Sequence, residues 1–488
     1  MSDTLRDRAK ALNRRLPTAQ YVGAASISGP LVVISGTRGV AYGETVEVIG
    51  TDGAMRRGRV VEVSQDRAVV EVWSGTSGLV AADTRVRFVG RPLEIPVARE
   101  MLGRVFTGSG EPLDGLPKPV AERMADVNGL PINPTARQYP RSLIVTGISV
   151  IDCMNTLIRG QKLPIFSGSG LPHNELAAQI VRQAHLLSSD EPFAIVFVAL
   201  GIRHDDAEFF RHSLQESGAL NRTAMFLNLA SDAPMERIMA PRAGLTLAEH
   251  LAFEHDMHVL VIMTDMTNYG EALRELGSQR GEVPSRKGYP GYLYSDLASH
   301  YERTGIVRGH KGSITQVPIL VMPNDDISHP IPDLTGYITE GQIVLGRELH
   351  GQNIYPPINV LPSLSRLMKD GVGEGYTRAD HPALSNQLYA AYARVGDIRS
   401  LAAVVGEEEL SPVDRRYLAF GEAFEHQFLN QGRDEDRSLE QTLDLGWQVL
   451  SLLPREELTR VSESVLTDHY IAPSEDKTTE GDGAAAAD

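Results

Sequence analysis

The stretch LPIFSGSGLPHNELAAQIVRQA, from Leu163 to Ala184, decides the fold class of this chain. It begins with a short apolar segment, passes through a glycine-rich turn and ends in a helical pattern of apolar residues. A strand, a glycine-rich turn and a helix in this order form the phosphate-binding loop of many nucleotide-binding α/β domains. The stretch alone is equally consistent with a strand-turn-helix unit that never bound phosphate, so neighbouring motifs must decide.

The residues that would hold phosphate are replaced. A working loop reads G-x-x-x-x-G-K-[ST], and the same eight positions here are Ser167, Gly168, Ser169, Gly170, Leu171, Pro172, His173 and Asn174. Pro172 has no backbone N–H to offer a phosphate. His173 is mostly neutral at pH 7, where a lysine would be charged, and Asn174 is a poorer Mg²⁺ ligand than a hydroxyl. The pattern predicts a loop that keeps its architecture but has nearly lost its affinity for phosphate.

Composition limits the partners of the chain. Its 488 residues carry a formal net charge of −16, and a polyanion repels nucleic acid and anionic lipid, so we expect neither as a main partner. Cys153 is the only cysteine, which excludes an internal disulfide and a multi-cysteine metal site. The longest apolar runs, such as FAIVFVALGI from Phe193, are far shorter than the roughly 20 residues that span a bilayer. We expect a soluble chain, or one that reaches a membrane only through other subunits.

Hydropathy patterns predict a multidomain α/β protein. Short alternating segments separated by turn signals, such as Ser64-Gln65-Asp66, predict a β-barrel. Apolar strands that alternate with helical stretches then predict a parallel sheet with covering helices, and apolar stripes such as Phe420, Phe424 and Phe428 predict a helical domain. The predicted segments are an N-terminal extension (1–19), the β-barrel (20–92), a P-loop-like nucleotide-binding α/β domain (93–375), the helical domain (376–472) and a disordered acidic tail (473–488).

Two further strand ends bear on nucleotide chemistry. The apolar run HVLVIMTD ends in Asp265, where such folds place the carboxylate that orients the Mg²⁺ shell. This signal is weak, because many strands end in aspartate. The run FVALGI ends in Gly201 and Ile202, where catalytic members of hexameric ATPases carry Gly-Glu. Ile202 cannot accept a proton, so a second catalytic part is absent.

The segment YPPINVLPSLSR, from Tyr355 to Arg366, fits the signature shared by the alpha and beta subunits of rotary ATPases. Together with LVIMTDMTNYGEALRE, GYPGYLYSDLASHYERTG and HPIPDLTGYITEGQI, it closely resembles the B subunit of vacuolar- and archaeal-type ATPases and ATP synthases. The resemblance covers roughly residues 20–471. It implies the order β-barrel, nucleotide-binding α/β domain and helical domain that the hydropathy patterns also predict.

The resemblance implies a non-catalytic subunit. In this family three A and three B subunits alternate in a ring, and the catalytic sites lie at the A/B interfaces. Arg366 stands at the position of the arginine finger that B supplies to the partner's nucleotide, with Ser365 beside it at the interface. The chain is then expected to have no cofactor of its own, with MgATP or MgADP at the interface with the A subunit. Its expected partners are A and the central rotor and peripheral stalk subunits, on the cytoplasmic side of the membrane.

Other candidate sites are weaker. His250, His255 and His258 lie near acidic residues, but their spacings do not put all three on one helix face, so we expect solvated helix and loop residues there and no metal site. Asp325 and Asp326 stand in a proline-rich loop, where turn formation and solvation explain them better than acid–base chemistry. The cysteine is expected to be a small buried residue rather than a nucleophile.

Two alternatives remain open. The first is a subunit that binds nucleotide without hydrolysing it, as the alpha subunit of F-type ATPases does; positions 172–174 oppose tight binding, although adenine can dock without phosphate contacts. A hexameric RNA translocase of the Rho type has a similar barrel-plus-ATPase plan, but the net charge of −16 and the altered loop oppose it. The direction of the complex, synthase or pump, and the ion moved, H⁺ or Na⁺, depend on other subunits.

Overall fold

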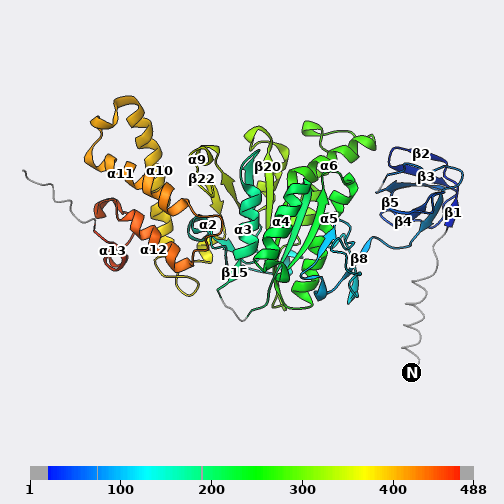
Figure 1. The fold of residues 1–488 in the computed structure, drawn as a ribbon, viewed down its shortest axis with the longest axis horizontal. Coiled ribbons are helices and arrows are strands. Elements are labelled where there is room, and N and C mark those ends of the chain that lie inside the picture. The colour runs from blue at the N-terminus through cyan, green and yellow to red at the C-terminus, as the bar shows by residue number, and fades with distance from the viewer. Residues whose placement is uncertain (1–19, 74, 188–190, 473–488) are drawn as a thin grey trace, which may run out of the picture.

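The structure is a computed structural model that describes residues 20–73, 75–187 and 191–472. The predicted N-terminal extension and acidic tail lie outside these residues. Three parts follow one another along the long axis of the molecule: a β part, a central α/β part and a helical part (Figure 1). This confirms the predicted fold class, including the order of its three parts. Among the described residues, no helix is long and apolar enough to cross a bilayer.

Seven short antiparallel strands form the N-terminal part. In spatial order they are β1 (Gln20–Val22), β7 (Arg85–Phe88), β4 (Thr45–Ile49), β5 (Met55–Val63), β6 (Arg67–Val72), β3 (Leu31–Ser35) and β2 (Ser26–Ser28). Because side chains alternate between the two faces of a strand, the alternating pattern turns Val46 and Val48 of β4 into a core where both are fully buried. The predicted turn after β5 is present, and Ser64 N donates to Arg67 O across it at 2.8 Å.

The central part is built on one large, mostly parallel sheet. Its main path runs β22 (Ile358–Ser365), β21 (Gly341–Leu345), β14 (Ile165–Gly168), β20 (Ser313–Met322), β18 (His258–Thr264), β16 (Phe193–Ile202), β17 (Thr223–Leu229) and β9 (Val105–Thr107), and β19 (Gly305–Val307) joins β11 (Arg137–Gln138) to β20. The edge strand β22 runs antiparallel to β21. Two small antiparallel sheets lie beside it: β8 (Glu94–Val97) with β10 (Arg123–Asp126), and β12 (Leu143–Val145) with β13 (Leu157–Ile158) and β15 (His185–Leu186).

Helices cover both faces of this sheet (Figure 1). They are α2 (Ser149–Met154), α3 (His173–Gln183), α4 (His204–Glu216), α5 (Pro234–Phe253), α6 (Met266–Gln279), α7 (Leu293–Tyr301), α8 (Pro330–Ile338) and α9 (Arg347–Gly351). Alternate side chains of β16 enter different cores: Ile195 and Phe197 pack with α2, α3 and α4, whereas Val196 and Val198 pack with α5, α6 and α7. A strand that is buried on both faces needs the continuous apolar sequence found here.

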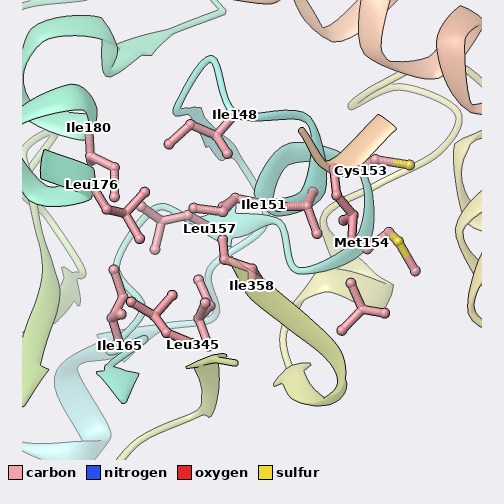
Figure 2. Packing of buried hydrophobic residues seen from close by; sticks show 14 of the residues in the cluster. Ile148, Ile151, Cys153, Met154, Leu157, Ile165, Leu176, Ile180, Leu345 and Ile358 are labelled. Atoms are coloured by element: carbon pink, nitrogen blue, oxygen red, sulfur yellow. The ribbon is translucent and has the colours of Figure 1, made fainter. Parts of the chain in front are cut away.

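The helical part shares the first of these cores. It contains α10 (His381–Val405), α11 (Pro412–Ala423), a π-helical turn (Phe424–Leu429), α12 (Leu439–Leu450) and α13 (Glu463–His469). The predicted aromatic stripe is confirmed, because the ring of Phe424 stacks 5.8 Å from Phe420 and 5.2 Å from Phe428 between centroids. Figure 2 shows Ile151 and Met154 of α2 at the centre of the same core, beside Ile358 of the edge strand. The helical part is therefore packed directly onto the α/β part.

Candidate functional site

The glycine-rich stretch folds as the sequence predicts. β14 ends at Gly168, an exposed turn follows, and α3 begins at His173 directly after Pro172. Gly170 has a φ of +81°, a conformation that favours glycine. Glu175 lies in the first turn of α3, where the helix dipole favours a negative charge. The strand, turn and helix of a phosphate-binding loop are all present as architecture.

His173, in the lysine position, faces the loop rather than solvent. Its Nδ1 lies 3.0 Å from Leu171 O and 3.2 Å from the hydroxyl oxygen of Ser167. Burial lowers the pKa of His173 below its ordinary value, although the nearby carbonyl opposes this shift. The imidazole is therefore neutral at pH 7, and it ties the loop together where a lysine would extend toward a phosphate.

An ion pair closes the loop from the other side, and sequence reasoning missed it. Arg347 donates from Nε to Asp325 Oδ2 at 2.8 Å and from Nη2 to Asp325 Oδ1 at 2.9 Å. The same Nη2 lies 3.1 Å from the carbonyl oxygen of Ser169. A Cβ atom added to Gly168 would lie only 2.1 Å from Asp325 Oδ1. The carboxylate of Asp325 therefore occupies space beside the loop backbone.

The sheet register explains this approach. β20 lies next to β14, and Met322 pairs with Gly168 at the last position of both strands. The chain leaves β20 at the same carboxyl end of the sheet at which the loop leaves β14, so Asp325 lies close to the loop. The hydrogen bonds from Arg347 lower the pKa of Asp325 below its ordinary value, which keeps it ionised at neutral pH. The interpretation of Asp325 as a turn residue alone was incomplete, since it also forms this ion pair.

Asp265 and Ile202 lie at this same end of the sheet: Ile202 is the last residue of β16, and Asp265 directly follows β18. Asp265 accepts hydrogen bonds from Thr267 N at 2.8 Å and from Val321 N at 3.2 Å, and thereby caps α6. Burial raises the pKa of Asp265 to about 6. Ile202 packs in the core with α4 and is 6% exposed. The structure thus brings the loop, Asp265 and Ile202 together at the carboxyl ends of the parallel strands, where Asp265 is buried and hydrogen-bonded.

Arg366 follows the last residue of the edge strand β22. Its backbone N donates to Glu340 O at 3.0 Å, and its side chain is exposed. Ser365 beside it is buried, and its hydroxyl donates to Thr156 O at 2.8 Å. The amide of the fully buried Gln161 donates both to Ser365 Oγ and to Glu340 O, each at 3.0 Å. Within residues 20–73, 75–187 and 191–472, the guanidinium of Arg366 has no hydrogen-bond or ion-pair partner.

Arg366 and the glycine-rich loop lie at opposite ends of the parallel strands. Ser365 pairs with Gly341, the first residue of β21, because β22 and β21 are antiparallel. β21 is parallel to β14, so this pairing lies at the amino ends of the parallel strands. Backbone hydrogen bonds put Arg366 near the level of Lys162, and strand rise separates Lys162 from Ser169 by about 20 Å. The guanidinium is therefore beyond reach of the loop in its own chain.

A cavity of about 550 Å³ lies beside the closed loop. Its lining includes Leu171 from the loop, Arg347 from the ion pair, and Tyr392 and Arg399 from α10. Arg399 donates to both carboxylate oxygens of Glu425 at 2.7 and 2.9 Å. The cavity is large enough for a small ligand, and the carboxylate of Asp325 also lines it.

The histidine cluster differs from the expectation. His258 is buried and its Nδ1 lies 2.9 Å from Ser313 Oγ. His250 is also buried, and together with His255 it contacts Glu122, which is distant in sequence. The interpretation of these histidines as solvated residues was wrong for His250 and His258. Cys153 is fully buried, as predicted, and burial raises the pKa of its thiol.

Comparison with known proteins agrees with this architecture. Family models match three successive segments: the beta-barrel domain of the ATP synthase alpha/beta family at residues 25–90, the nucleotide-binding domain of that family at residues 147–365, and the C-terminal domain of V and A type ATP synthase at residues 370–471. The matches therefore cover all three parts of the structure.

Curated relatives are similar over nearly their whole length. The chain is 63% identical to the V-type ATP synthase beta chain of Halothermothrix orenii over 93% of this chain and 98% of the relative. It is 62% identical to the B subunit of the A-type ATP synthase of Aeropyrum pernix, with the same coverage of 93% and 98%.

A solved structure is also similar. The ATP synthase subunit NeqB from Nanoarcheaum equitans matches with a TM-score of 0.70 and 40% identity, over 87% of this chain and all of that one. These similarities lend no support to the RNA-translocase alternative. The chain belongs to the family of V- and A-type ATP synthase beta or B chains.

Proposed function

We propose that this chain is the non-catalytic B subunit of a V/A-type ATP synthase or ion-pumping ATPase. It alternates with a catalytic A subunit in a ring of three A and three B chains. Arg366 enters the neighbouring A subunit's site as an arginine finger, and Ser365 fixes the backbone from which it extends. The observation that carries the proposal is the exposed guanidinium of Arg366, which has no partner among the described residues. It lies at the amino ends of the parallel strands, whereas the chain's own glycine-rich loop lies at their carboxyl ends.

The altered loop supports a non-catalytic role. It offers no lysine, and its histidine bonds within the loop. The carboxylate of Asp325 lies where it repels a phosphate. Ile202 offers no group to orient water. Three separate parts of a phosphoryl-transfer site are therefore replaced.

The mechanism assigned to this chain is electrostatic. Charge spreads over the oxygens of the transferred phosphoryl group in the transition state, and a guanidinium at that point stabilises it. Gln161 and Ser365 hold the backbone at Arg366 from the buried side, so that the side chain emerges from a fixed point. The nucleotide, MgATP or MgADP, is bound at the A/B interface, and this chain brings no cofactor of its own.

The expected partners are the A subunit, the central rotor and the peripheral stalk subunits. The location is cytoplasmic and peripheral on the membrane, through the rest of the complex. The proposal predicts that the isolated full-length chain hydrolyses no ATP and binds MgATP with a high-micromolar or weaker dissociation constant. Isothermal titration calorimetry tests this. A sub-micromolar constant that depends on residues 167–174 would contradict the proposal.

A second candidate function is nucleotide binding without hydrolysis. The cavity of about 550 Å³ beside Leu171 and Tyr392 favours it, since an adenine ring needs an apolar or aromatic wall more than it needs a phosphate cradle. Equilibrium dialysis with adenosine and with MgATP distinguishes the two functions. Equal affinity for both ligands indicates docking of the base alone, and no binding of either supports the purely structural subunit.

A further inference from the structure

Three metal-ligating side chains from separate segments meet away from the nucleotide-binding loop. They are Glu122, just before β10, His250 in the last turn of α5, and His255 after that helix. One ligand atom from each lies within 4.8 Å of the other two. We propose that they form a binding site for a zinc-class divalent cation, which ties the β8–β10 sheet to the end of α5.

The backbone brings the two histidines together after the helix ends. α5 ends at Phe253, and the chain then folds back over the last turn of the helix, where Met257 N donates to Leu251 O at 3.1 Å. His255 lies within this turn, and its ring lies 5.0 Å from that of His250 between centroids, edge to face. A spacing of five residues does not share one helix face, but a turn after the helix removes that restriction. The sequence argument against a site considered the helix alone.

The third donor is held in place from the other side. Glu122 accepts a hydrogen bond from Arg99 N on Oε1 at 3.0 Å, and its own backbone N donates to Val97 O at 3.1 Å. This leaves Oε2 to face the histidines.

Both histidines present the same ring nitrogen to one point. Nε2 of His250 lies 3.0 Å from Glu122 Oε2, and Nε2 of His255 lies 2.7 Å from it. Ligand atoms around a tetrahedral zinc ion are separated by about 3.3 Å, given bond lengths near 2.0 Å. The three donor atoms therefore need small rotations, not a backbone rearrangement, to surround a cation.

The donor set selects the class of cation. Two imidazole nitrogens and one carboxylate oxygen suit Zn²⁺, with water as a fourth ligand. Mg²⁺ and Ca²⁺ prefer oxygen ligands alone. Nδ1 of His250 is buried and lacks a hydrogen-bond partner among the described residues. Because a second hydrogen bond normally orients a ligating histidine, we expect weaker binding than at a four-ligand structural site.

The position argues for a structural role, independent of the proposed finger. His255 precedes β18, so the cluster lies at the amino end of that strand. Asp265 and the glycine-rich loop lie at the opposite end of the sheet, at the carboxyl ends of the parallel strands. A cation there connects segments remote from the phosphate chemistry, and its loss changes local stability rather than phosphoryl transfer.

The test uses the full-length chain without a histidine tag. Zn²⁺ binding is measured by competition with a chromophoric chelator, and Co²⁺ serves as a spectroscopic probe of coordination geometry. We expect one site per chain with tetrahedral Co²⁺ absorption, and a rise in thermal midpoint with Zn²⁺ but not with Mg²⁺. Glu122→Gln, His250→Gln and His255→Gln are each expected to weaken Zn²⁺ binding by about tenfold or more.

His212→Gln is the matched control. His212 and Glu216 form an exposed pair with 3.0 Å between Nδ1 and Oε2, a histidine–carboxylate contact with only two donors. Its replacement should leave the site unchanged. If wild type and Glu122→Gln bind Zn²⁺ equally, or if His212→Gln weakens binding as much, the proposal is wrong. His255 is partly exposed, so His255→Gln keeps the test valid even if the buried His250 variant fails to fold.

Discussion

Asp325 and Arg347 form a two-point ion pair against the glycine-rich loop, with 2.8 Å between Nε and Oδ2 and 2.9 Å between Nη2 and Oδ1. The carboxylate lies so close to Gly168 that a single added carbon would collide with it. An ion-paired carboxylate thus lies against a loop whose counterpart in phosphate-binding folds attracts an anion. The glycine at this position is needed by the ion pair, whether or not phosphate ever binds.

Removing that charge should open the loop. In Asp325→Ala the repulsion disappears and Arg347 is released as a cation beside the turn, so we expect MgATP affinity to rise about tenfold, or about 1.4 kcal/mol. Equilibrium dialysis on the isolated chain measures this. The control is Asp326→Ala, because Asp326 pairs with Lys287 instead. Unchanged affinity in Asp325→Ala would show that Asp325 does not close the loop.

Gly168→Ala should destabilise the chain by about 1–3 kcal/mol, because the new methyl group meets Asp325 Oδ1 at 2.1 Å. The same change in an Asp325→Ala background should cost much less. Thermal midpoints of the four proteins form a double-mutant cycle. Gly291→Ala is the control, since a Cβ there meets nothing within 4 Å. Additive effects of Gly168→Ala and Asp325→Ala would rule out the predicted contact.

Arg366→Ala should leave the ring assembled with the A chains and reduce its ATP turnover by roughly 10³- to 10⁵-fold. Arg366→Lys should restore little, because an ammonium lacks the planar fork that meets two oxygens. Nucleotide affinity at the A site should change much less than turnover, since the contact strengthens mainly in the transition state.

Size-exclusion chromatography followed by turnover per assembled complex measures this effect. Lys369→Ala removes an exposed cation from the same segment and is the matched control. Assembled Arg366→Ala complexes that turn over within a few-fold of wild type would refute the finger assignment. Failure to assemble, with normal turnover in the few intact complexes, would instead assign Arg366 to holding the interface.

Restoring the loop should not create a catalyst. Pro172→Gly, His173→Lys and Asn174→Thr together return the phosphate-binding groups, and nucleotide binding should improve. Turnover should stay absent because Ile202 still offers no group to position water, a function worth about 10²- to 10⁴-fold in rate. The assay uses complexes whose A chains are disabled. Substantial turnover by this triple variant would count against the role assigned to Ile202.

Asp265→Asn should change how stability depends on pH. Burial raises the pKa of Asp265 from an ordinary 3.8 to about 6, so the folded state favours the protonated form. Its contribution to stability is present below about pH 4 and is lost as pH rises to about 6, by up to about 3 kcal/mol. Asparagine keeps an oxygen for Thr267 N and does not titrate.

The measurement is the difference in thermal midpoint between Asp265→Asn and wild type across this range. The difference should move in favour of the variant from pH 4 to pH 6. Other buried carboxyls, such as Asp152 with a pKa of about 7, are common to both proteins, so their effects cancel in the difference in thermal midpoint. A difference that is constant with pH would mean that Asp265 titrates normally.

The sequence by itself determined the strand-turn-helix of residues 163–184, the loss of the phosphate lysine and the signature that directly precedes Arg366. These features are local: backbone hydrogen bonding and side-chain periodicity act within windows of a few residues, so a short stretch carries the information. The order of the three parts could be predicted for the same reason. The burial of the aromatic stripe at Phe420 followed from its helical spacing.

Only the tertiary structure decided how distant loops meet. The ion pair at Gly168 depends on β20 lying beside β14, and the cluster at Glu122 depends on a turn after α5. The opposite placement of Arg366 and its own loop depends on one antiparallel edge strand. The sequence therefore suggested only a turn at Asp325 and solvated residues in the histidine cluster. No periodic pattern encodes these relationships, because strand order and loop approach are set by long-range packing of the whole sheet.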